Sequence, residues 1–160
     1  MSKMRIPQTP ALRALRAAGA AFSLHTYAYE EKGGTRVSSD KLGVDEHIVI
    51  KTLVMEDEKA RPLLILMHGD KEVSTKELAR TLGVKSITPC KPETARRHTG
   101  YMVGGTSPFG TKKELAVYME KTIADLPEIL INAGARGLLA KMSPAELTRI
   151  LHAREVSVAI

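Results

Sequence analysis

Long apolar runs predict the centre of a β-sheet. Residues 47–57 and 60–70 are mostly apolar and rich in branched side chains, which is typical of buried strands, and the second is the expected antiparallel partner of the first. Shorter segments with a strand-like pattern lie at 22–29, 85–90, 113–120, 127–134 and 154–160. The 113–120 pattern also fits a helix. Residues 101–103 are candidates for an extended segment, and 30–36 are expected to form a loop.

Five other segments carry helix signals, at residues 9–19, 38–44, 74–83, 91–100 and 143–153. In the first, Thr9 is a natural N-cap, Pro10 suits the first helical position and Gly19 the C-terminal stop. Leu12 and Leu15 then fall on one apolar face. We therefore interpret this Arg-bearing start as a structural helix.

Capping residues define the starts of three further helices. Ser38 or Ser39 would cap the 38–44 helix. The segments 74–77 and 143–146 each place a glutamate three residues after a serine, which is the capping-box pattern. Short strands and helices without strict alternation predict an α+β fold with a mixed, largely antiparallel sheet. The length predicts a single domain spanning residues 1–160.

Charge narrows the range of partners. The formal net charge is +6 and no acidic residue precedes Glu30, a balance that favours a polyanionic partner such as nucleic acid. Four tyrosines, two phenylalanines and no tryptophan argue against a base-stacking platform, so contact with phosphates and shape is expected. No apolar run approaches the roughly 20 residues of a membrane span. The lone cysteine, Cys90, fits a reducing compartment, and we expect a cytoplasmic protein.

The residues support few kinds of catalytic chemistry. The five histidines are scattered and there is no second cysteine, so no metal site is expected. Cys90 is interpreted as a small buried residue rather than a nucleophile. A Ser–His–Asp set needs no proximity in sequence and stays open.

The segment 98–110, HTGYMVGGTSPFG, contains four glycines and no lysine, arginine or carboxylate. Gly105 and Gly110 have the separation of a phosphate-binding P-loop, but Thr111 stands where lysine is required. The segment also lacks the final glycine of a nucleophile elbow. It is therefore interpreted as a rigid, proline-containing turn whose backbone amides could cradle an anion or a carbonyl oxygen.

Lys51 lies inside the apolar run 47–57. A lysine in that position extends to solvent, pairs with a carboxylate or faces a cleft, where it would supply positive charge to a phosphate or a developing oxyanion. Tyr27 is by default a core or edge tyrosine.

Several of these stretches together resemble the YbaK/ProX family of aminoacyl-tRNA deacylases. The resemblance runs over nearly the whole chain, and it is carried by TPALRALRAAG, HTY, IVIKTLV, TGYMVGGTSPFG, INAGARGL and SPAELTRILHA. It implies a mixed, mostly antiparallel sheet curled into a partial barrel with helices outside. It also implies an enzyme without a cofactor that deacylates Cys-tRNA(Pro), with Cys-tRNA(Cys) as a further candidate.

The resemblance also implies how the ester is cleaved and which molecules the protein acts with. Small side chains are poorly discriminated by a synthetic site, so a second site must edit the errors. The substrate cysteine's own thiol would attack the ester and release a thiolactone. The partners would be the acceptor end of tRNA(Pro) and prolyl-tRNA synthetase.

The resemblance also implies site residues. Lys51 would be the catalytic residue, holding the terminal adenosine or the ester. The substrate-binding residues would be Tyr27, Thr52, Gly104, Gly105, Thr106, Ser107, Asn132 and Gly134. Leu139 departs from the acidic or polar residue common in relatives, which leaves open an enzyme for Ala-tRNA(Pro) or another small residue. A non-catalytic module that binds tRNA ends or nucleotides is the alternative from another class.

Overall fold

The two long apolar runs form the central hairpin of the structure. The computed structural model describes residues 6–160, and in it β2 (Val49–Asp57) pairs antiparallel with β3 (Pro62–His68). This hairpin is part of an eight-stranded sheet with the order β1-β7-β6-β2-β3-β5-β8, and β4 pairs with β2 off that path. The other strands are β1 (Ser23–Thr26), β4 (Ile87–Pro89), β5 (Ala116–Glu120), β6 (Ile129–Asn132), β7 (Leu138–Met142) and β8 (Arg154–Val156).

The sheet is mixed. Strand pairs β1–β7, β2–β3, β2–β4 and β6–β7 are antiparallel, whereas β2–β6, β3–β5 and β5–β8 are parallel. Strands β1 and β8 end the order without pairing with each other, so the sheet is not closed. The α+β class and the mixed sheet are confirmed. The 113–120 segment, which also fitted a helix, contributes strand β5.

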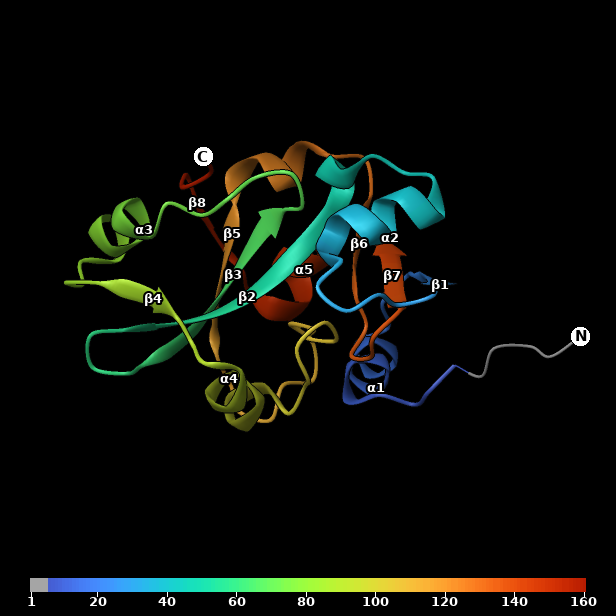
Figure 1. The fold of residues 1–160 in the computed structure, drawn as a ribbon, viewed down its shortest axis with the longest axis horizontal. Coiled ribbons are helices and arrows are strands. Elements are labelled where there is room, and N and C mark those ends of the chain that lie inside the picture. Colours follow the sequence, from blue (N-terminus) through green and yellow to red (C-terminus); the bar gives the residue numbers. More distant parts are fainter. Residues whose placement is uncertain (1–5) are drawn as a thin grey trace, which may run out of the picture.

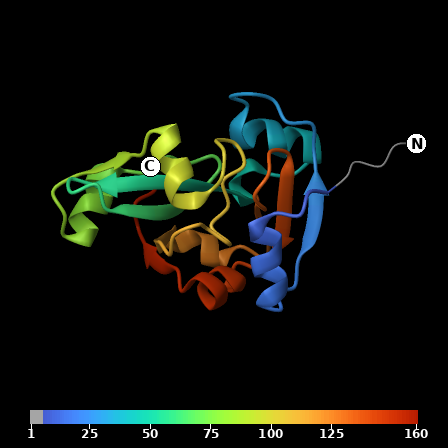
Figure 2. The same cartoon turned by 90° about the horizontal axis from the view of Figure 1, so that it is seen from below.

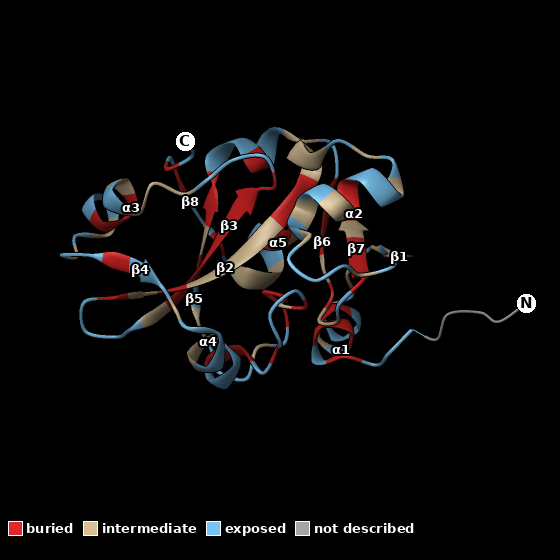
Figure 3. Ribbon diagram, in the orientation of Figure 1, coloured by how far each residue is buried: buried red, intermediate tan, exposed pale blue. Residues whose placement is uncertain are grey.

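One edge of β2 is shared by two strands, and this leaves an interval of that edge without a paired strand among the described residues. Strand β6 pairs with β2 at Val49 and Ile50, and β4 pairs with it from Met55 to Asp57. In the described part of the chain no strand covers this edge over residues 51–54. The same residues are half-buried, visible as the tan stretch of β2 in Figure 3.

Helices cover both faces of this sheet (Figure 1). They are α1 (Pro10–Ala17), α2 (Gly34–Leu42), α3 (Thr75–Leu82), α4 (Pro92–Thr99) and α5 (Ala145–Leu151), with short 3-10 turns η1 (Glu46–Ile48) and η2 (Lys121–Asp125). The alternation of strand residues separates two apolar layers. The inner face, which carries Ile50, Leu66 and Ile131, packs with α1, α5 and the glycine-rich segment.

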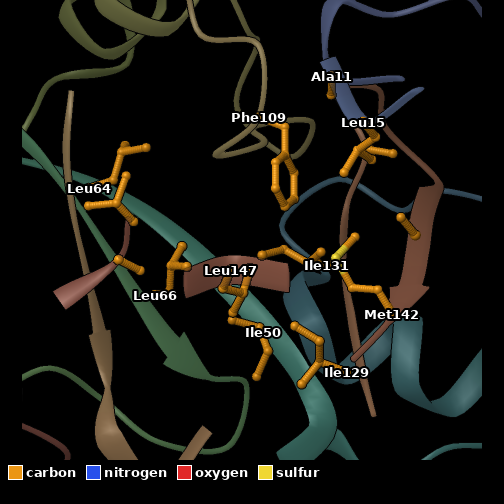
Figure 4. Close-up of a cluster of buried hydrophobic side chains, with 14 of the residues drawn as sticks. Ala11, Leu15, Ile50, Leu64, Leu66, Phe109, Ile129, Ile131, Met142 and Leu147 are labelled. Carbon is orange, nitrogen blue, oxygen red and sulfur yellow. The ribbon is translucent and has the colours of Figure 1, made fainter. Parts of the chain in front are cut away.

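On the opposite, outer face, two smaller clusters lie under different helices. Met55, Ile65 and Met67 pack with Leu78 of α3. The second cluster, made of Val49, Leu130 and Leu139, packs with Leu42 of α2. Figure 4 shows the larger inner cluster, into which the ring of Phe109 points from the glycine-rich segment.

Helix signals near the N-terminus are confirmed. The hydroxyl of Thr9 accepts a hydrogen bond from the Leu12 amide at 3.0 Å and donates to the Ala133 carbonyl at 2.6 Å. The cap therefore also ties α1 to the turn that follows β6. Similarly, Ser74 accepts from the amide of Glu77 at 3.2 Å and caps α3.

The capping boxes, however, are incomplete. The Glu77 carboxylate pairs with Arg80, and the Ser74 amide donates instead to the Val158 carbonyl. At α5 the Ser143 hydroxyl accepts a hydrogen bond from the Ala145 amide at 3.3 Å, as predicted for a cap, but Glu146 binds Arg149 and the Ala21 amide and not the Ser143 amide. Arginines one helical turn later, and at α5 also the distant Ala21 amide, thus take up the carboxylates that the local pattern assigned to capping.

The helix predicted at 38–44 begins earlier, at Gly34, inside the segment predicted to be a loop. The hydroxyls of Ser38 and Ser39 donate to carbonyls of the same helix and cap nothing. The Thr35 hydroxyl bonds to the Glu46 carboxylate at 2.7 Å, so a contact outside the segment stabilises the earlier start. Residues 101–103 are not a strand, because they lead into a turn closed by a Gly105–Met102 hydrogen bond.

The substitution Thr9→Ala should lower the free energy of unfolding by about 1–2 kcal/mol, because it removes a helix cap and leaves a buried carbonyl without its donor. For a chain of this size the melting temperature should fall by about 2–8 °C. Thr9→Ser keeps the hydroxyl and should recover most of the loss in thermal unfolding. Unchanged melting of Thr9→Ala would show that the cap is not stabilising.

Candidate functional site

Lys51 projects from the middle of β2 on the outer face, opposite to Ile50. Its ammonium donates to the Lys71 carbonyl at 2.5 Å and lies 3.5 Å from a Glu72 carboxylate oxygen. The lysine side chain is 19% exposed, whereas that of Glu72 is 81% exposed. The sequence left three environments open for this lysine: solvent, a carboxylate partner or a cleft. In the structure Lys51 has a carboxylate partner and lies half-buried beside the uncovered edge of β2.

The segment that holds the ammonium, residues 69–73, is called here the anchoring loop. The Nδ1 atom of His47 lies 2.8 Å from a carboxylate oxygen of Asp70. The backbone of Glu72 exchanges two hydrogen bonds of 2.9 Å with Ile160. Both ends of the anchoring loop are therefore tied down, one by a side chain and one by the chain terminus. No local pattern in the sequence indicates this arrangement, because His47 and Asp70 are 23 positions apart and Glu72 and Ile160 are 88 positions apart.

Asn132 connects Lys51 to the glycine-rich segment. Val49 lies beside Leu130 and Ile50 beside Ile131 in the parallel β2–β6 pair. The next step of this register sets Lys51 beside Asn132 on the outer face, at the point where the strands separate. The Asn132 amide nitrogen donates to the Gly104 carbonyl at 3.2 Å. Two predicted site residues and the segment around Gly104 thus converge from three parts of the chain.

The glycines of the segment are required by packing between two loops. A Cβ atom on Gly104, whose φ is +86°, would collide with the Tyr29 hydroxyl. A Cβ on Gly105 would lie 3.0 Å from the Arg136 backbone nitrogen. Gly134, with φ +97°, would bring its Cβ within 2.9 Å of the Tyr101 ring. The bare backbone lets the 101–110 segment lie directly on the turn between β6 and β7.

Internal hydrogen bonds occupy some of the donors in this segment. The Gly105 amide donates to the Met102 carbonyl at 2.9 Å, and the Thr106 hydroxyl donates to the same carbonyl at 3.3 Å. Ser107 is fully buried, and its hydroxyl accepts from the Phe109 amide at 3.2 Å. Within residues 6–160, the N–H groups of Gly104 and Thr106 have no hydrogen-bond partner. Together with the amides of Met102, Val103, Ser107 and Gly110, which also lack a partner among the described residues, these are the donors that the segment can offer a ligand.

Arg136 and Tyr29 complete this side of the site, and sequence reasoning missed both. The Arg136 Nε atom donates to the Val103 carbonyl at 2.9 Å, and its guanidinium lies 4.9 Å from the centroid of the Tyr29 ring. The side chain therefore fastens the tip of the segment to the β6–β7 turn. The sequence shows Arg136 between Gly134 and Gly137, but only the fold shows that this arginine binds the Val103 carbonyl.

Tyr27 and Leu139 lie on the same outer face, farther from the edge. The Tyr27 amide donates to the Gly137 carbonyl at 3.0 Å, and its side chain packs against the cluster of Val49, Leu130 and Leu139. Burial raises the pKa of the Tyr27 hydroxyl above its usual range. Leu139 is 4% exposed and keeps this part of the face apolar.

Thr52 is separated from Lys51 by the alternation of β2, so it points to the inner face with Ile50 and Val54. Its hydroxyl is the buried side-chain polar atom that has no hydrogen-bond partner within the described residues 6–160. A buried hydroxyl without a partner costs stability and is uncommon in native structures. Among the predicted site residues, Thr52 is therefore the one whose hydroxyl has no role in the hydrogen bonding of residues 6–160.

Other candidate centres are weaker. Two hollows, of about 270 and 360 Å³, lie beside Tyr118 and beside His152, and neither is lined by Lys51 or Gly104. No group of three or more metal-ligating side chains occurs within residues 6–160. Burial raises the pKa of the Cys90 thiol to about 11, which makes it a poor nucleophile. No helix in the described part of the chain could cross a membrane.

Comparisons with known proteins agree with the resemblance. Residues 34–150 match the family model of the aminoacyl-tRNA editing domain. The chain is 28% identical over 146 residues to EbsC of Enterococcus faecalis, to which Cys-tRNA(Pro)/Cys-tRNA(Cys) deacylase activity is ascribed, and the match covers 90% of this chain and 89% of EbsC. It is 32% identical over 112 residues to a proline–tRNA ligase of Thermodesulfovibrio yellowstonii. That match covers 70% of this chain and 18% of the ligase.

Solved structures share the fold. A protein described as a trans-editing enzyme for prolyl-tRNA synthetase superposes with a TM-score of 0.83 at 22% identity, over 97% of this chain and 99% of that one. The hypothetical protein APE2540 superposes with a TM-score of 0.86 at 20% identity, over 94% and 99% of the two chains. At these identities the likeness is one of fold.

The substitution Thr52→Val should raise the free energy of unfolding by about 1 kcal/mol, because it replaces an unpartnered buried hydroxyl with a methyl group of similar size. Thermal unfolding should shift upward by about 2–4 °C. Thr99→Val is the matched control: Thr99 is also buried, but its hydroxyl donates to Ala95 and accepts from Tyr101, so this change should destabilise. Equal losses in both variants would show that the Thr52 hydroxyl is satisfied.

Proposed function

The chain belongs to the aminoacyl-tRNA editing domain family, and we propose that it is a trans-editing deacylase that acts on misacylated Cys-tRNA(Pro). The observation that carries the proposal is the convergence of Lys51, Asn132 and Gly104 at the uncovered edge of β2. A positive charge and two backbone amides are the groups needed around an ester that gains negative charge during cleavage. The similarity to EbsC supports cysteine as the amino acid and Cys-tRNA(Cys) as a further substrate.

The proposed reaction uses the substrate as its own nucleophile. The cysteine thiol attacks the ester carbonyl carbon, a C–S bond forms and the C–O bond to the ribose breaks. The thiol proton goes to the departing ribose oxygen, and the products are free tRNA and a cysteine thiolactone that water then opens. The amides of Gly104 and Thr106 would bind the carbonyl oxygen, while Lys51 would stabilise the developing charge. No enzyme nucleophile or cofactor is needed.

The partners follow from the same proposal. The substrate is the acceptor end of a misacylated tRNA(Pro), and prolyl-tRNA synthetase is the enzyme whose error is corrected. Support comes from the similarity to a proline–tRNA ligase segment and from the fold shared with a trans-editing enzyme for that synthetase. The reaction would take place in the cytoplasm, where aminoacylated tRNA is used.

Two observations favour alternatives. Leu139 makes the outer face apolar beside Tyr27, which would suit the methyl group of alanine and favours an Ala-tRNA(Pro) deacylase. The thiol mechanism cannot operate on alanine, so this enzyme would have to activate water. In addition, the Lys51 ammonium is occupied by the Lys71 carbonyl and Glu72, which favours a module that binds the tRNA end without turnover.

The decisive measurement is deacylation of a panel of Cys-, Ala- and Ser-tRNA(Pro), with prolyl-tRNA synthetase present and absent. The protein should release cysteine fastest, and Lys51→Ala should slow release by about 100-fold or more, the loss typical of a deleted charge-stabilising donor. Lys59→Ala is the control, since Lys59 is an exposed lysine in the turn of the same hairpin. No release from any of the three substrates would refute deacylation, and faster release of alanine would establish the Ala-specific alternative.

A further inference from the structure

A group of exposed cations, unpaired within the described part of the chain, lies beside the glycine-rich segment. The last turn of helix α4 carries Arg96 and Arg97, and the chain returns to this end of the helix at Lys112 and Lys113. The amide of Lys112 donates to the Thr99 carbonyl and that of Lys113 to the His98 carbonyl, both at 3.0 Å. These backbone bonds hold Arg96, Arg97, Lys112 and Lys113, here called the α4 basic surface, together at one end of the helix.

The four cations are exposed and lack carboxylate partners. Within residues 6–160 none of the four forms an ion pair. Glu93 precedes Arg96 and Arg97 by three and four positions, the spacing at which helix pairs form, yet it pairs with neither. Elsewhere in residues 6–160 some cations form ion pairs, namely Lys41, Lys51, Arg61, Arg80, Lys141 and Arg149, and others, such as Lys76 and Lys121, do not. What distinguishes the α4 basic surface is therefore that backbone hydrogen bonds hold four exposed, unpaired cations at one place.

Helix stability accounts for only part of this charge. Cations near a helix C-terminus interact favourably with the helix dipole, which suffices for Arg96 and Arg97. Lys112 and Lys113 add charge from another segment, and the Lys113 ammonium lies 3.0 Å from Nδ1 of His98. Burial, together with the charges of Lys113 and Arg97, lowers the pKa of His98. Exposed cations that form no ion pair among residues 6–160 attract an external polyanion.

The position of the surface relates it to the candidate site. Gly104 follows Arg97 by seven residues, so their Cα atoms are at most about 25 Å apart. Figures 1 and 2 both show α4 next to the glycine-rich segment. Met102 and Val103, 48% and 55% exposed, come between the cations and Gly104 along the chain. An extended polyanionic chain could therefore run from the α4 basic surface, across Met102 and Val103, to Gly104 at the candidate site.

We propose that the α4 basic surface binds the phosphate backbone of the tRNA acceptor stem and directs its 3′ end across Met102 and Val103 to Gly104. This inference rests on the proposed function for the identity of the RNA. Exposed arginine and lysine side chains suit phosphates, and they read shape and charge rather than base sequence. The surface would therefore contribute affinity for any tRNA and leave identity to the synthetase.

The test compares two variants that each lose four positive charges, at different places on the surface. The test variant is R96Q/R97Q/K112Q/K113Q, and the control, with exposed cations elsewhere, is K76Q/R80Q/K121Q/R154Q. Binding of an uncharged tRNA(Pro) transcript is measured by fluorescence anisotropy from 50 to 300 mM salt, after circular dichroism melting has shown that both variants fold. Loss of four phosphate contacts should reduce the slope of log K against log salt by about three and weaken binding by about tenfold or more. The control should change far less.

A parallel deacylation assay separates this inference from the proposed function. With both correct, the test variant shows a raised KM for Cys-tRNA(Pro) and an unchanged kcat. A wild-type protein that does not deacylate, but whose tRNA binding depends on these four residues, would refute the function and support the surface. Equal salt slopes in the two variants would overturn the surface. It would also be overturned if the test variant kept its affinity for tRNA and lost binding to prolyl-tRNA synthetase, which would mark a protein-docking surface.

Discussion

The divided edge of β2 is the constraint on which the rest of the structure depends. A strand in the middle of a sheet needs hydrogen-bond partners on both edges, and β2 receives a continuous partner only from β3. On the other edge β6 covers the beginning and β4 the end. The interval between them exposes Lys51, and the end of β6 brings Asn132 to the same place. A strand covering the whole edge would remove the position that we propose for the substrate.

The glycine-rich segment acts as a rigid wall, and its glycines serve packing first. Phe109 enters the inner core, and the Tyr101 hydroxyl donates to the Phe109 carbonyl at 2.6 Å. Gly104 and Gly105 then allow close contact with the β6–β7 turn, which Arg136 fastens. The segment is held at its base and at its tip, so the unoccupied amides have fixed directions. Preorganised donors of this kind stabilise charge without reorganisation.

Charge is arranged to complement these two features. Near the edge of β2 the single cation, Lys51, is held by the anchoring loop, whereas the α4 basic surface has no carboxylate partners among residues 6–160. A held charge suits a reacting ester, because its position matters. Unpaired charges on exposed side chains suit a phosphate backbone, because they lose few existing contacts on binding. In the proposed function, the two kinds of cation would serve two different parts of the RNA end.

Local signals in the sequence determined much of the fold. The cap at Thr9, the hairpin of β2 and β3 and the α+β class depend on hydrogen bonds and alternation within a few residues, and they were predictable. The start of α2 and the missing Glu146 half of the box at Ser143 were not, because contacts with residues distant in sequence, Glu46 and Ala21, contribute to them. The motifs likewise pointed to Lys51 and Gly104 separately. Only the tertiary structure decided that Asn132 joins them, since register between distant strands is set by packing and not by local pattern.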